Sequence, residues 1–458
     1  MTNTRLDEGS GPDWEQMRKK RPSRRASLEL TTWLCMALCV GAALAAIAED
    51  EFELPPLNYS RVEPDDEVHR LLRRIDENPA LLRSGSDKEF LQALLRELKV
   101  SADSQVLVFS KTSLQRQRIG PETPRAIYFS DRCYVGWVPG GDAEVISFDP
   151  ALGATFYIVP RESFHDKPAL RRNNECLSCH ASSRTRGVPA PLVRSVFPDE
   201  RGEAILSAGS FSITQQNPLS ERWGGWYVTG RHGSERHMGN VIAREQPGGA
   251  TLDREKGANL VRLDPFFPTH RYLRPGSDIV ALMVLEHQVG VQQKLHEANQ
   301  NVRFAVHRYE ALMRELKEPA QDSLGGSARS VVEHYAKKLI EEMLSVEEAP
   351  LTGGGVEGGR EFVEAFQRVA IRDRKGRSLR DLELHTRLFR HRMSYLIYSP
   401  SFDGLPRPLR EEFWSQLWKV LKDERSPEPF DRLRREDKQT VVEILAETKP
   451  GLPAYWRP

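Results

Sequence analysis

The chain has 458 residues, more than a single domain of about 150 residues would use, so two or more folding units are expected. Hydrophobic residues make up 39% of it, which is enough for a sizeable core. The 66 Lys and Arg residues nearly balance the 65 Asp and Glu residues, so no overall positive field attracts a nucleic acid, and none is expected as a partner. Five cysteines are too few for a disulfide scaffold.

The N-terminal region carries an export pattern. Residues 30–48 hold no charge, follow the basic run RKKRPSRR at residues 18–25, and end in Ala46-Ile47-Ala48. A basic run, an apolar stretch and an A-x-A end are typical of a cleaved signal peptide. A stretch of this length can also cross a bilayer as an uncleaved anchor with its basic flank inside. We therefore predict that residues 1–48 are a basic region with a signal peptide or transmembrane anchor. The protein is expected in the periplasm, either free or tethered to the inner membrane through residues 30–48.

Residues 49–245 are predicted to form an α+β domain. Two short helices are expected at residues 67–76 and 88–99. Gly, Pro and Asp turns then separate β-rich runs, which favours antiparallel hairpins. These runs lie at residues 105–109, 126–129, 134–138, 143–148, 155–159, 192–197, 204–213 and 225–229.

A C-x-x-C-H motif lies inside this domain, at Cys176-Leu177-Ser178-Cys179-His180. This is the attachment pattern of c-type haem, in which two thiols bind the haem vinyl groups and the adjoining histidine is the proximal iron ligand. A zinc knuckle would need two further ligands at short spacing, and there is no second C-x-x-C. A thioredoxin-like redox pair is expected at a strand-to-helix junction, whereas the flanks here read as loops. We predict one covalently bound haem c on Cys176, Cys179 and His180, with the knuckle and the redox pair as the alternatives.

Five arginines surround the motif. Guanidinium groups pair bidentately with carboxylates, so they suit the two haem propionates. Each one taken singly could equally belong to a solvated basic loop. They are Arg171, Arg172, Arg184, Arg186 and Arg194.

Candidates for the sixth iron ligand cluster in residues 223–240. His232, His237 and Met238 lie there beside Trp223, Trp226 and Tyr227, which could wall a haem pocket. Met238 is the first choice, because a thioether ligand raises the reduction potential. His237 or His232 would instead give a centre of lower potential. An open sixth position, or a distant ligand such as His287, remains as the other alternative.

The second half reads as helical. Residues 246–276 are rich in Gly, Pro and Arg and are predicted to connect the α+β domain to a mainly α-helical domain at 277–458. Ser277 is the expected N-cap of the first helix. The helices are predicted at residues 277–316, 328–345, 360–371, 379–397, 408–421 and 438–448.

The chain resembles a family of exported bacterial proteins that bear one c-type haem and whose biochemical role is uncharacterised. The resemblance covers most of residues 55–456. It is carried by PRAIYF at 124–129, ECLSCH at 175–180, RSVFPD at 194–199, residues 221–240 and SYLIYS at 394–399. It implies a periplasmic cytochrome-like protein and a haem role for His237-Met238. The stretch Arg390-His391-Arg392-Met393 departs from the family pattern, so no role is carried over to it.

These patterns predict a periplasmic c-type cytochrome that passes single electrons to a redox partner protein. Two alternatives stay open. One is a haem enzyme with an open distal site, either peroxidase-like or acting on another small molecule. The other is a PAS-like haem sensor or scaffold, in which the helical half receives a signal or docks a partner. The sequence identifies no catalytic residue and no substrate.

Overall fold

The computed structural model describes residues 50–165, 169–318 and 324–456. The predicted leader at residues 30–48 lies outside these ranges. Within them, no helix is both long enough and apolar enough to span a bilayer. The chain from Phe52 to Pro458 forms one compact unit.

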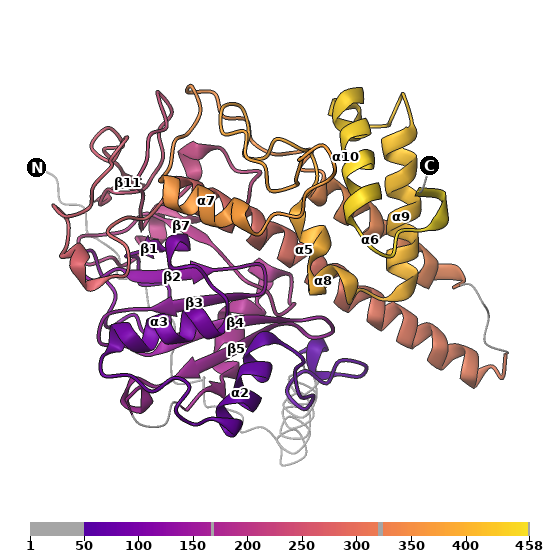
Figure 1. The fold of residues 1–458 in the computed structure, drawn as a ribbon, viewed down its shortest axis with the longest axis horizontal. Helices are drawn as coiled ribbons and strands as arrows, with labels where there is room; N and C mark the ends of the chain where they lie inside the picture. The colour runs from indigo at the N-terminus through magenta and orange to yellow at the C-terminus, as the bar shows by residue number, and fades with distance from the viewer. Residues whose placement is uncertain (1–49, 166–168, 319–323, 457–458) are drawn as a thin grey trace, which may run out of the picture. The chain divides into compact units, whose positions relative to one another are not determined.

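A seven-stranded antiparallel sheet organises this unit (Figure 1). Its strand order is β6-β5-β4-β3-β2-β1-β9. The five central strands fall where the β-rich runs predicted them, and the mixed α+β fold is confirmed at this level. Their bounds are β1 Val106–Val108, β2 Arg125–Phe129, β3 Cys133–Trp137, β4 Ala143–Asp149, β5 Gly153–Val159, β6 Arg171–Arg172 and β9 Trp226–Tyr227.

The segment between the two edge strands contains the C-x-x-C-H motif. The chain leaves β6, passes through the short helix α4 (Leu177–His180), and returns to the opposite edge of the sheet at β9. On the way β7 (Arg194–Val196) pairs with β8 (Ser210–Ser212), so the predicted strand at 204–213 is much shorter than expected. A second small hairpin, β10 (Arg244–Gln246) with β11 (Gly249–Thr251), follows.

Helices cover both faces of the sheet. On one face lie α2 (Glu67–Glu77) and α3 (Asp87–Glu97), whose first turns are capped by the side chains of Asp66 and Ser86. The other face packs against the long helix α5 (Ile279–Glu315). The remaining helices are α6 Gly326–Met343, α7 Arg360–Arg368, α8 Pro400–Asp403, α9 Arg407–Lys422 and α10 Arg435–Thr448.

Alternation along the strands divides the core into two layers. In β3, Tyr134 points into the layer that contains α5, whereas its neighbour Val135 points into the layer that contains α2 and α3. Strand residues and helical residues from both sides of position 276 belong to the α5 layer. The hydrophobic core is therefore continuous across the predicted domain boundary, although whether the two halves fold separately stays a prediction.

Two local predictions were wrong. The N-cap of α5 is Asp278, whose Oδ1 accepts from Ala281 N at 2.9 Å, while Ser277 Oγ instead accepts from Leu107 N and ties the start of the helix to β1. The predicted helix at 379–397 is irregular apart from a short turn at Tyr395–Tyr398. There the Glu383 carboxylate accepts from three successive backbone N–H groups, at residues 385–387, which competes with helical hydrogen bonding.

Candidate functional site

The two cysteines of the motif lie on a continuous turn. A short 3-10 turn at Asn174–Cys176 runs into α4, and the Asn173 side chain caps it by accepting from Glu175 N at 3.1 Å. Cys176 is half-buried and Cys179 is exposed, and both are free thiols. Burial raises the pKa of Cys176 to about 12, so this thiol is protonated at neutral pH.

His180 is held in one tautomer. Its Nδ1 lies 2.9 Å from the backbone oxygen of Ala190, and a carbonyl oxygen only accepts, so Nδ1 carries the proton and Nε2 the lone pair. In the part of the chain that the structure describes, Nε2 makes no hydrogen bond. The centroid of the His180 ring lies 5.0 Å from that of Phe156. Burial lowers the pKa of His180, so the imidazole stays neutral. A metal-ligating histidine usually donates the N–H of its other ring nitrogen to a carboxylate, a backbone carbonyl or water, as Nδ1 does here.

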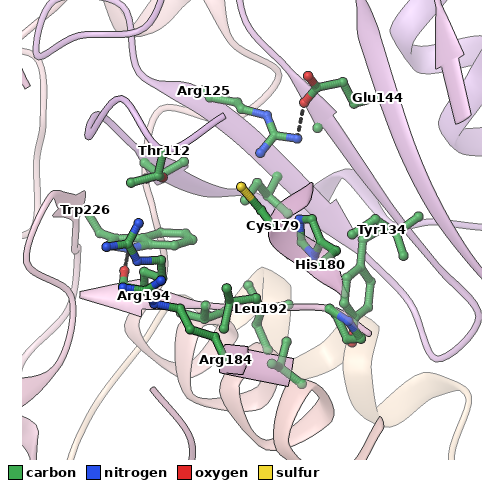
Figure 2. A pocket seen from close by; sticks show the side chains of 18 of the residues that line it. Thr112, Arg125, Tyr134, Glu144, Cys179, His180, Arg184, Leu192, Arg194 and Trp226 are labelled. Carbon is green, nitrogen blue, oxygen red and sulfur yellow. Dashed lines mark hydrogen bonds and ion pairs between the residues drawn. The ribbon is translucent and has the colours of Figure 1, made fainter. Parts of the chain in front are cut away.

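A cavity opens beside Cys179 and His180 (Figure 2). Its volume is about 190 Å³, below the roughly 300–1,000 Å³ of typical pockets for organic ligands, so only part of a large ligand would lie inside it. Strands β1, β2, β4 and β9, the segment just before β7 and the N-terminal part of α5 supply the apolar side chains of its walls. These include Val108, Ile127, Ile146, Leu192, Val193, Trp226, Leu285 and Val289.

An ion pair crosses one wall of the cavity. Arg125 of β2 pairs with Glu144 of β4, and the guanidinium lies over Gly136 of the strand between them. A Cβ on Gly136 would stand only 2.1 Å from Arg125 Nη2, so any side chain there would displace the arginine. Arg125 Nε is buried without a hydrogen-bond partner. The absent side chain of Gly136 therefore makes the room in which Arg125 reaches the cavity.

The side chains present are of the kinds that a covalently bound haem requires. A neutral histidine presents an unengaged Nε2 and two free thiols precede it. Cys179 and His180 line the cavity, whose walls are about equally polar and apolar, whereas Cys176 does not line it. Of the five arginines near the motif, Arg184 and Arg194 line this cavity. Across the described ranges, no group of three or more His, Cys, Asp or Glu side chains could hold a metal ion by itself.

None of the three predicted distal ligands lines the cavity. Met238 is fully buried, with its Sδ 3.6 Å from Ser195 Oγ. Both ring nitrogens of His232 are engaged, since Nδ1 lies 2.9 Å from Glu235 O and Nε2 accepts from Asn259 N at 2.8 Å.

His237 lies next to His232, with ring centroids 4.6 Å apart. Its Nδ1 accepts from Gly239 N at 3.0 Å, while its Nε2 is buried without a partner. Burial lowers the pKa of His237 to about 3. The alternative His287 is also buried elsewhere, with Nδ1 against Gln215 and Nε2 against Ser394. Among the described residues that line the cavity, His180 is the one histidine and there is no methionine. The identity of the sixth ligand stays a prediction.

Three functional residues were missed by the sequence reading. Arg125 shares its strand face with Ile127 and Phe129, and Glu144 shares its face with Ile146 and Phe148. Each of these charged residues is followed at intervals of two by apolar residues, so it lies on the buried face of its strand. That pattern could have identified the pair from the sequence. The third, Ala190, acts through its backbone oxygen and left no signal.

No protein-family model, curated protein or solved structure matches the chain. The family resemblance predicted from the sequence therefore stays a prediction.

Proposed function

We propose that this protein is an exported c-type cytochrome that carries one haem on Cys176 and Cys179, with His180 as the proximal ligand. The observation that carries the proposal is the hydrogen bond from His180 Nδ1 to Ala190 O, beside two free thiols and a cavity of mixed polar and apolar lining. When bound, a haem supplies one-electron redox chemistry, with a potential set by the axial ligands and by burial.

The chain's own residues have distinct tasks in this proposal. Each thiol adds its S–H across a vinyl double bond, which needs no oxidant because the sulfur and the hydrogen end on the two vinyl carbons. Ala190 O holds the proton on Nδ1 of His180 and so aims Nε2 away from the backbone. The apolar side chains of the cavity wall, such as Ile127 and Val289, lower the local dielectric constant beside them.

The primary function we propose is electron transfer to a redox partner in the periplasm. Cys179 is exposed, so a group bound to its sulfur lies close to the surface that a partner can approach. The net charge of +1 is close to zero, which fits a partner recognised by a local patch rather than by the field of the whole molecule.

A second candidate is small-molecule chemistry at an open sixth position. The observation that favours it is the composition of the cavity, whose described walls lack a second histidine or a methionine and carry the Arg125–Glu144 pair instead. A guanidinium within such a cavity can donate hydrogen bonds to a bound oxygen or nitrogen species.

The attachment is tested by mass spectrometry of protein expressed with a haem-attachment system. The parent should carry the mass of one haem through denaturation, and the Cys176→Ser, Cys179→Ser double variant should not. Cys133→Ser is the matched control, because this buried thiol lies in the opposite core layer and should leave the haem mass in place. Covalent haem in the double variant would refute the proposal.

The visible spectrum of the ferric protein then separates the two candidates. A low-spin spectrum that cyanide leaves unchanged supports electron transfer and rules out the open position. A high-spin spectrum that shifts on adding cyanide supports the second candidate and rules out simple electron transfer.

A further inference from the structure

We propose that Arg184 and Arg194 form a carboxylate-binding pair on the cavity wall and hold the two propionates of the haem. This inference rests on the proposed haem function. The observation behind it is that two arginines without carboxylate partners line one cavity together with Cys179 and His180.

The structure separates these two arginines from the other three near the motif. Arg172 donates to the backbone oxygens of Tyr59 at 2.7 Å and Val62 at 3.1 Å, and its guanidinium lies 4.4 Å from the Tyr59 ring centroid. Arg186 forms an ion pair with Glu297 at 2.8 Å. Arg171 is exposed on the edge strand β6 and does not line the cavity.

Arg194 is held in place by its own strand. It begins β7, and its backbone oxygen accepts from Trp226 Nε1 at 2.8 Å, which links the strand to the cavity wall. Its Nη2 donates to Ser210 Oγ at 3.1 Å, but its Nε is buried without a hydrogen-bond partner. A buried donor with no partner costs free energy, so an acceptor that reaches this nitrogen would be stabilising.

Arg184 brings a second positive charge to the same wall. It comes from the short turn Ser183–Thr185, and in the described ranges its guanidinium makes neither a hydrogen bond nor an ion pair. Arg184 and Arg194 line the same cavity and lie on the same side of it (Figure 2), and burial and the nearby charge of Arg184 both lower the pKa of Arg194. Two neighbouring guanidinium groups without a counter-ion favour the binding of an anion.

The charge of the cavity matches a dicarboxylate. Its walls carry three arginines and one glutamate, and the glutamate is paired with Arg125. The two remaining positive charges belong to Arg184 and Arg194, which lie on the side of the cavity away from Arg125 and Glu144 (Figure 2). A haem brings two propionates into its site, so the charges would cancel.

The test uses the haem-loaded full chain and its reduction potential as a function of pH. A guanidinium within about 4–6 Å lowers the pKa of a carboxylate by 1–3 units. In an Arg184→Gln, Arg194→Gln variant the propionates should therefore titrate at higher pH. The inflection in the plot of potential against pH should rise by about 1–3 units. The reduction potential itself should fall. Nearby cations destabilise the ferric form more than the ferrous form, so removing them favours the ferric form.

Arg186→Gln is the matched control, since this arginine is paired with Glu297 and should leave the inflection in place. Single variants give each arginine's share, which matters because Arg184 also borders a neighbouring polar hollow. If the double variant keeps its covalent haem mass and its inflection is unchanged, the propionate assignment is overturned while the haem proposal stands.

A second arm asks whether the carboxylates come from a soluble acid instead. Succinate is titrated calorimetrically into the haem-loaded parent and into the double variant. No binding to the parent, together with the shifted inflection in the variant, supports the propionate assignment. Binding to the parent that is lost in the double variant would mean that a soluble dicarboxylate occupies the pair, and would overturn the assignment.

Discussion

His287 illustrates how a polar side chain is kept neutral inside this core. Its ring is fully buried on α5, with Nδ1 2.6 Å from Gln215 Oε1 and Nε2 2.8 Å from Ser394 Oγ. Nδ1 donates to the amide oxygen and Nε2 accepts from the hydroxyl, so both nitrogens of a neutral imidazole are satisfied. In an imidazolium, Nε2 would carry a proton and could no longer accept from the Ser394 hydroxyl. Burial lowers the pKa of His287 to about 3.

This arrangement predicts a loss of stability in acid. In the unfolded chain a histidine binds a proton near pH 6.5, whereas folded His287 does so only near pH 3, so protons favour unfolding as the pH falls between these values. The expected contribution is up to about 1.4 kcal/mol per pH unit. His287→Gln should reduce the slope of the unfolding free energy against pH, measured by urea titration between pH 4 and 6.

The same titrations at pH 8 to 9 provide the internal control. There the ring is neutral in the folded and unfolded states alike, so parent and variant should show equal slopes even if the variant is less stable. An unchanged slope between pH 4 and 6 would contradict the prediction.

At the scale of elements, α5 connects the sheet to the C-terminal helices. Every residue from Ile279 to Gln292 is buried, which means that this N-terminal part of the helix is surrounded on all sides. Towards its C-terminus the helix becomes amphipathic, and Leu312 is 53% exposed. The same helix therefore contains both buried and solvent-exposed positions, which allows matched substitutions to be compared.

Matched leucine truncations on α5 should differ sharply. Leu285 is 2% exposed and lines the cavity, so Leu285→Ala should cost about 2–5 kcal/mol of unfolding free energy. Leu312→Ala changes the same number of atoms at an exposed position and should stay within about 0.5 kcal/mol of the parent. Chemical denaturation of both variants provides the measurement. Equal losses would mean that α5 is not packed as described.

At the scale of the whole molecule, one core layer joins strands and helices far apart in sequence. Phe156 of β5 and Trp226 of β9 belong to the same buried cluster as Leu282, Leu339 and Leu417 of α5, α6 and α9. A sheet face that packs on helices cannot be exposed without a large hydrophobic cost.

A fragment that ends at residue 276 should therefore not fold alone. Without α5, the inner face of the sheet would be open to water, so residues 49–276 should bind the dye ANS and unfold without a cooperative transition. Co-expression with residues 277–458 should restore a soluble complex. Cooperative thermal unfolding of the isolated fragment would contradict this prediction and support two separate domains.

The sequence predicted the regular elements better than the site. The strands β2 to β5 and the helices α2, α9 and α10 were placed to within a few residues, because period-two and period-3.6 patterns reflect which side is buried. The C-x-x-C-H motif could also be recognised, since its spacing is local, whereas its role in haem attachment stays a prediction. The cavity could not be predicted, because Arg125 and Gly136 are brought together by strand register. Ala190 O reaches His180 through the path of a loop, and a single sequence encodes neither locally.

The motif's position between the two edge strands has a geometric consequence. The chain leaves the sheet at β6 and rejoins it at β9, on the far edge. With neighbouring strands about 4.8 Å apart, the two edges lie roughly 30 Å from each other, a span that about ten extended residues could bridge. Residues 173–225 are much longer than this tether requires. Much of the extra length is packed into the molecule, because Val193, Ile213, Leu219 and Trp223 belong to the core layer of α5. Insertions should therefore be tolerated in exposed turns of this segment, such as the one at Leu206, and not at the buried positions.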